Sequence, residues 1–129
     1  MSTSAATDCL FCTLPPTRIV HANRLAVVIQ DAYPVSRGHT LVLPRRHVGS
    51  LFELEPLERD AVFELLDLAR RDLDQSLHPD GYNIGVNVGK AGGQTRMHVH
   101  VHLIPRYAGD VPDPSGGIRC VLAGKQHAA

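Results

Sequence analysis

The chain has 129 residues and a mass of 14.0 kDa, a length that suits one globular domain and leaves no room for a second. Thirteen basic residues balance thirteen acidic ones, which argues against the broad positive field of a sequence-independent nucleic-acid binder. No apolar run approaches the ~18 residues of a membrane span, and the N-terminus lacks the pattern of a signal peptide. We therefore expect a cytoplasmic protein that binds neither nucleic acid nor membranes.

Short strands and one long helix are predicted along the chain. Residues 1–8 are expected to be flexible. The expected strands are 19–21, 26–29, 40–43, 82–87 and the segment that starts at 98. Between the third and fourth strands, apolar residues from Leu57 to Leu77 recur with a helical spacing, and Pro56 suits the first helical position. One long helix among strands predicts an α+β fold with a mainly antiparallel, five-stranded sheet.

Histidines alternate with apolar residues at positions 98 to 102. Successive side chains of a strand point to opposite faces, so His98, His100 and His102 are expected to share one face. An imidazole is enclosed without cost only where it finds hydrogen-bond partners, so three in register indicate chemistry. One metal ion cannot bind all three, because residues i and i+4 of a strand lie about 13 Å apart. At least one of the three histidines must therefore have a function other than binding that metal ion.

The segment from Asn87 to Thr95 is rich in glycine, amide and hydroxyl residues. Glycines let a backbone approach a ligand closely, and the polar side chains can bind phosphate oxygens. Most glycine-rich segments before strands are only turns. Three alternating histidines directly after this one favour a phosphate-binding site.

The cysteines indicate a metal or redox site. There are three, an odd number, and Cys9 and Cys12 form a Cys-x-x-Cys pair. This arrangement suits a tetrahedral metal site or a redox pair better than a disulfide framework. By itself the pair leaves a metal site, a redox site and no role at all as open alternatives.

Residues Gly93 to Ile104 resemble the signature of the histidine-triad (HIT) superfamily of nucleotide hydrolases and transferases. Asp31-Ala32-Tyr33-Pro34 and the segment from Gly38 to Pro44 resemble further landmarks of that family. The resemblance covers residues 9–107, the expected HIT domain. It implies a HIT-like fold with short helical pieces between the main elements, a homodimer, and a purine nucleotide as substrate. Residues 108–129 form a C-terminal extension that we expect to pack on or near the active site.

The central histidine, His100, is the predicted nucleophile, because a neutral imidazole attacks phosphorus without a separate strong base. Attack would give a nucleotidyl-histidine that water then hydrolyses. The second ring nitrogen is expected to be held by a backbone carbonyl. His102 and His39 are expected to donate hydrogen bonds to phosphate oxygens or to orient the nucleophile, and Gln94 is expected to help at the phosphate. Whether magnesium assists is left open.

The resemblance also implies a substrate-binding set in which Asp31 binds the ribose hydroxyls. Arg96 departs from the family, in which positions 96 and 97 are commonly apolar or aromatic. It would share the face of the histidines, and reach the leaving phosphates, if the strand already runs there. The predicted set is Asp31, Asn87, Gly93, Gln94, Thr95 and Arg96. An aspartate at a strand end is otherwise more often a turn or cap residue.

Metal-bearing relatives pair such cysteines with two histidines, which implies a structural zinc ion held by Cys9, Cys12, His47 and His98. His98 would then be tied to metal while His100 stays free to attack. The similarity to bacterial members favours hydrolysis of a diadenosine polyphosphate or a similar substrate. The alternatives are an adenosine phosphoramidate hydrolase and a non-catalytic, zinc-stabilised module that binds nucleotides or a protein partner.

Overall fold

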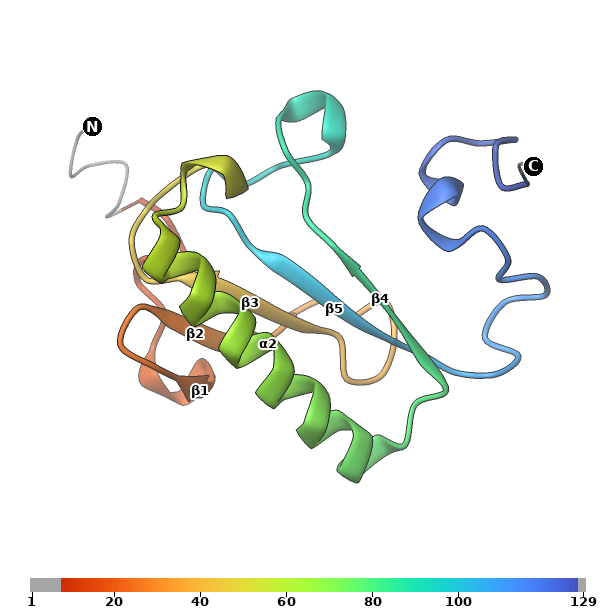
Figure 1. Cartoon of the computed structure of the whole chain (residues 1–129), viewed down its shortest axis with the longest axis horizontal. Coiled ribbons are helices and arrows are strands. Elements are labelled where there is room, and N and C mark those ends of the chain that lie inside the picture. Colours follow the sequence, from red (N-terminus) through yellow and green to blue (C-terminus); the bar gives the residue numbers. More distant parts are fainter. Residues whose placement is uncertain (1–7, 128–129) are drawn as a thin grey trace.

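The structure is a computed structural model that describes residues 8–127 and contains one five-stranded antiparallel sheet (Figure 1). Residues 1–7 of the predicted flexible segment lie outside the described residues. The strands are β1 (Ile19–Ala22), β2 (Ala26–Gln30), β3 (Thr40–Pro44), β4 (Gly81–Gly85) and β5 (Val101–Arg106). Their order is β1-β2-β3-β5-β4, and each neighbouring pair is antiparallel. The predicted fold class is confirmed.

The long helix α2 (Pro56–Leu77) covers one face of the sheet (Figure 1). It begins with Pro56 and a reciprocal capping box between Glu55 and Glu58, and it ends at His78, which adopts a left-handed conformation. The apolar stripe of the helix packs on side chains of β2, β3 and β5. The buried residues of this cluster are Val62, Leu65, Leu66 and Ala69 of the helix and Ala26, Val28, Val42, Val101 and Leu103 of the strands.

The opposite face of the sheet is covered by the N-terminal segment. Val27, Ile29, Leu41 and Leu43 point to this side, where Phe11, Leu14 and Ile19 pack against them. Along β5, buried residues that face the helix alternate with half-buried ones. His102 belongs to the second group, so the histidine face of β5 lies opposite α2.

Residues 8–127 also contain four short 3-10 helices, as expected for the short helical pieces. They are η1 (Pro16–Arg18), η2 (Leu51–Glu53), η3 (Lys90–Gly92) and η4 (Gly117–Val121). Among residues 8–127, no helix has the length and apolar character needed to cross a membrane.

The structure corrects the start of the histidine strand. β5 begins only at Val101, which pairs with Val42 of β3. The backbone leaves this ladder before Val101, and the Val99 N–H donates to the Val48 carbonyl (2.7 Å) in the loop that precedes α2. His98 and His100 therefore precede the strand, although Val99 between them is buried. β4 likewise ends at Gly85, two residues before the predicted end.

Candidate active site and metal centre

A cavity of about 370 Å³ opens on the face of the sheet opposite α2. It brings together side chains from the N-terminal segment, the loop after β2, the glycine-rich loop and the histidine segment. The predicted residues that line it are Asp31, Asn87, Thr95, Arg96, His100 and His102. The structure thus gathers in one cavity predicted residues that lie far apart in the sequence, from Asp31 to His102.

The half-buried imidazole of His100 is oriented by the backbone. Its Nδ1 lies 3.0 Å from the carbonyl oxygen of His98. A carbonyl can only accept, so Nδ1 carries the proton and Nε2 keeps its lone pair. The ring also packs edge-on against Phe11 and His102, with centroids 5.1 and 5.0 Å away. Nε2 is therefore the nitrogen that can act as a nucleophile, and the acceptor expected from the sequence is the His98 carbonyl.

A chain of hydrogen bonds fixes the tautomer of His102. The Val35 N–H donates to His39 Nδ1 (3.1 Å), so the proton of neutral His39 is on Nε2. His39 Nε2 lies 2.9 Å from His102 Nδ1 and donates to it, which leaves the proton of His102 on its own Nε2. The buried His39 does not line the cavity. It is placed to orient His102 and not to touch a bound phosphate.

Burial keeps both of these histidines neutral. Desolvation, with smaller effects of His100 and His39, lowers the pKa of His102 to about 4. Desolvation also lowers the pKa of His39, although the nearby carboxylate of Asp31 opposes this shift. At neutral pH, His102 is an uncharged hydrogen-bond donor in the cavity wall.

Asp31 has two roles in the structure. Its Oδ1 accepts the N–H of Tyr33 (2.8 Å), which is the turn role that an aspartate at a strand end often has. Its Oδ2 lies 3.5 Å from His39 Nε2, and the residue also lines the cavity. The carboxylate that closes the turn therefore also stands at the cavity.

Gln94, for which we predict a role at the phosphate, is buried and is not among the residues that line the cavity. Its buried amide bonds three backbone groups: Oε1 accepts the Gly89 N–H (2.9 Å), and Nε2 donates to the carbonyls of Gly49 (2.6 Å) and Arg96 (2.9 Å). Gly93 contributes its left-handed backbone (φ 94°), with the Asn87 side chain beside it. A buried amide needs such partners, so Gln94 joins the glycine-rich loop to the loop before α2.

The four residues of the predicted metal site form one cluster, with donor atoms that all lie within 4.8 Å of one another. Cys12 Sγ lies 3.2 Å from His47 Nδ1 and 3.4 Å from His98 Nδ1, and Cys9 Sγ lies 3.5 Å from His98 Nδ1. His98 Nε2 donates to the Pro44 carbonyl (2.8 Å), so its Nδ1 presents a lone pair to the sulfurs. Two sulfurs and two imidazole nitrogens are a donor set for tetrahedral zinc.

The protonation of Cys12 depends on whether a cation is bound in this cluster. Burial and the adjacent Cys9 raise the pKa of Cys12 to about 11. Without a cation, the thiol therefore stays protonated at neutral pH, whereas a coordinated thiol is deprotonated. The four residues could hold one zinc ion.

Sequence reasoning missed the residues that the N-terminal segment contributes to the cavity. Leu10, Phe11 and Leu14 form an apolar wall, and Arg18 adds a guanidinium. Tyr33, from the loop after β2, was missed as well. The position of Phe11 between the two cysteines was the only available signal, because a metal site there would bring the segment to the histidines.

The C-terminal extension, which we expect to pack on or near the active site, lies at the β4 edge of the sheet in the described residues. Within residues 108–127, η4 packs along β4, on the sheet edge away from β1 (Figure 1). Ile118 approaches Gly85, and none of residues 108–127 lines the cavity.

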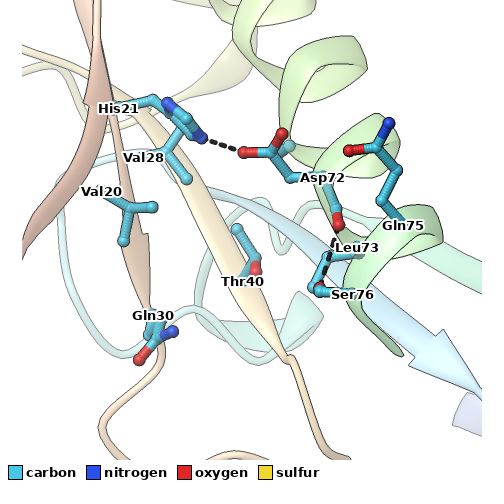
Figure 2. A pocket seen from close by; sticks show the side chains of 10 residues that line it. Val20, His21, Val28, Gln30, Thr40, Asp72, Leu73, Gln75 and Ser76 are labelled. Atoms are coloured by element: carbon cyan, nitrogen blue, oxygen red, sulfur yellow. Dashed lines mark hydrogen bonds and ion pairs between the residues drawn. The ribbon is translucent and has the colours of Figure 1, made fainter. Parts of the chain in front are cut away.

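A second cavity, of about 460 Å³, lies between β1 and α2 (Figure 2). His21 Nε2 and the carboxylate of Asp72 form a hydrogen bond there. The hydroxyls of Ser76 and Thr40 donate to the backbone carbonyls of Asp72 (2.9 Å) and Gly38 (2.7 Å). The polar groups thus serve the fold, and the His21–Asp72 pair joins the edge strand β1 to the helix.

A five-stranded sheet with three histidines and a cysteine pair on the face opposite the helix defines a histidine-triad domain. The HIT domain family model matches residues 14–109, and the chain belongs to this family. The resemblance inferred from the sequence is confirmed.

Three relatives illustrate the similarity. The AP-4-A phosphorylase of Mycobacterium tuberculosis is 36% identical over 93 residues, which are 71% of this chain and 48% of that protein. The adenylylsulfatase HINT3 of Arabidopsis thaliana is 31% identical over 109 residues, 81% of this chain and 55% of that protein. The chain thus spans about half of each enzyme. A crystal structure of a zinc-bound histidine triad family protein from Mycobacterium smegmatis superposes with a TM-score of 0.73, at 33% identity, covering 84% of this chain and 86% of that one.

Proposed function

We propose that the protein is a nucleotide hydrolase that cleaves a diadenosine polyphosphate or a similar nucleotide through a nucleotidyl-histidine intermediate. The hydrogen bond from His100 Nδ1 to the His98 carbonyl carries this proposal, because it leaves the Nε2 lone pair free in a cavity lined by polar residues. The relatives of the chain include an AP-4-A phosphorylase, and this similarity supports a nucleotide as the substrate.

In the first step, His100 Nε2 attacks a phosphorus atom of the substrate. The N–P bond forms as the P–O bond to the leaving phosphate breaks, and the imidazole gains positive charge. The His98 carbonyl faces the Nδ1–H, which stabilises that charge. His102 donates its Nε2–H to an oxygen on the reacting phosphorus, where negative charge develops. Water then attacks the same phosphorus and gives up a proton to solvent while the N–P bond breaks. This step releases the nucleoside monophosphate and restores neutral His100.

The nucleoside would lie along the N-terminal segment. The apolar wall of Leu10, Phe11 and Leu14 offers a surface for a purine base. Asp31 stands at the same cavity and supplies a carboxylate for the ribose hydroxyls.

We also propose that Cys9, Cys12, His47 and His98 hold a structural zinc ion. The cluster geometry and the zinc-bound relative support this proposal. A site closed by four protein ligands leaves no position for substrate, so the ion would supply stability and not chemistry. It would hold the segment around Phe11 against His98 and thereby keep the cavity wall in place.

An assay for turnover distinguishes this proposal from the alternative of a non-catalytic nucleotide-binding module. Purified protein should hydrolyse at least one member of a panel of diadenosine polyphosphates and adenosine phosphoramidates. His100→Ala should abolish turnover and leave the affinity for AMP within about threefold, since the nucleophile acts in the chemical step. His127→Ala, outside the cavity, is the matched control. Persistent turnover in His100→Ala would refute the proposed nucleophile.

The homodimer stays a prediction, which sedimentation velocity can test.

A further inference from the structure

The guanidinium of Arg96 lies on the Phe11 ring, beside the proposed nucleophile. Arg96 Cζ is 5.5 Å from the centroid of the Phe11 ring, and the His100 ring packs against the same phenyl group at 5.1 Å. All three residues line the cavity. A cation over an aromatic face is held electrostatically, so Phe11 acts as a platform that keeps this positive charge next to His100.

The platform itself is tied to the metal cluster. Phe11 stands between Cys9 and Cys12, in a turn closed by the Cys12 N–H and the Cys9 carbonyl (3.1 Å). The ring also packs perpendicular to His98, with centroids 5.8 Å apart. The position of the Arg96 charge is therefore set by the segment that carries the cysteine pair, although Arg96 itself is exposed.

Positive charge is scarce in this cavity. Among the described residues that line it, the permanent cations are Arg18 and Arg96, and Asp31 is the carboxylate. Arg18 already donates to the Gln30 carbonyl at the end of β2 (3.1 Å). Burial leaves His102 uncharged at neutral pH. No ion pair to a carboxylate engages Arg96 within residues 8–127.

We propose that Arg96 is a specificity-determining residue that binds the leaving phosphates and selects polyphosphate over amine leaving groups. A guanidinium matches phosphate oxygens with two parallel hydrogen bonds, whereas an uncharged amine leaving group offers it nothing to bind. In the reaction, the oxygen that leaves with the phosphate chain becomes more negative, and the Arg96 charge offsets this change. This inference rests on the proposed function and specifies its leaving group.

Arg96→Met tests the inference, because methionine removes the charge and keeps an unbranched side chain over Phe11. The value of kcat/KM should fall at least about tenfold for diadenosine tetraphosphate, as expected for the loss of a charged hydrogen bond, and change less than about twofold for adenosine 5′-phosphoramidate. Arg96→Lys should recover part of the loss. Arg71→Met, on α2 across the sheet, is the charge-matched control. Equal losses on both substrates, or no loss on either, would overturn the inference.

A binding experiment separates this inference from the proposed function. In the His100→Ala background, the affinities for ATP and AMP are compared by calorimetry with and without Arg96→Met. We expect the preference for ATP over AMP to fall at least about fivefold. An unchanged preference overturns the role of Arg96. If the preference falls but the wild-type protein hydrolyses no nucleotide, the role of Arg96 is sustained and only the hydrolase is refuted.

Discussion

The replacement of Gln94 by alanine distinguishes a structural amide from one that binds substrate. The side chain is 6% exposed and makes three hydrogen bonds to backbone groups, at 2.6 to 2.9 Å. These bonds hold the glycine-rich loop against the loop before α2. We therefore expect Gln94→Ala to destabilise the fold.

The size of the effect follows from the three partners. A hydrogen bond between neutral groups contributes about 1 kcal/mol net, so the loss of all three costs about 3 kcal/mol. Water can reach the exposed residues Gly89 and Arg96 after the substitution, which reduces the expected loss to about 2 to 3 kcal/mol. For a domain of this size that corresponds to a fall in Tm of about 10 °C.

Urea unfolding of the zinc-loaded protein, followed by circular dichroism, measures this loss. The matched control is Gln75→Ala, an exposed glutamine of α2, which should change the free energy of unfolding by less than about 0.5 kcal/mol. If Gln94→Ala keeps the stability of the wild type and loses kcat instead, the amide touches the substrate and our assignment is wrong.

Three further predictions concern the other parts of the site. Asp31→Ala should raise KM for ribonucleotide substrates at least about tenfold with a smaller change in kcat, because a ribose contact is made equally in the ground and transition states; an unchanged KM would speak against ribose binding. Elemental analysis should find about one zinc ion per chain. Cys9→Ser and Cys12→Ser should lose both the zinc and thermal stability, whereas His100→Ala should retain the zinc. Loss of zinc from His100→Ala would contradict the assignment of His98 to the metal and of His100 to the substrate. An NMR titration should find His102 neutral down to about pH 4. Because the imidazole of the unfolded chain takes up its proton near pH 6.5, protonation favours the unfolded chain, and this residue should lower the free energy of unfolding as the pH falls from about 6.5 to about 4. Titration of His102 near pH 6.5 in the folded protein would refute the assignment.

The succession of strands and helix along the chain could be predicted because short apolar runs bounded by turn residues indicate strands, whereas the apolar residues from Leu57 to Leu77 recur with a helical spacing. The start of β5 could not. The alternation of His98, Val99 and His100 predicts an extended backbone, but it does not show which strand or loop that backbone bonds to. Here Val99 bonds to Val48, outside the sheet ladder.

The site was predictable only in part, for a related reason. A motif identifies which residues carry polar groups, but Gln94 shows that a buried amide can bind the backbone instead of a ligand. Phe11 and Arg18 are remote from the histidines in the sequence and reach the cavity only through the fold. The Gly- and Pro-rich C-terminal segment carries no periodic pattern, so nothing in the sequence placed it along β4.

The division of work among the three histidines is tested most directly by locating the covalent intermediate. The zinc-loaded protein is mixed with diadenosine tetraphosphate, quenched within milliseconds at alkaline pH, digested and analysed by tandem mass spectrometry, with 31P NMR to assign the bonded nitrogen. We predict AMP attached to Nε2 of His100. An adduct on His98 or His102, on Nδ1 of His100, or no adduct during measurable turnover would contradict this mechanism.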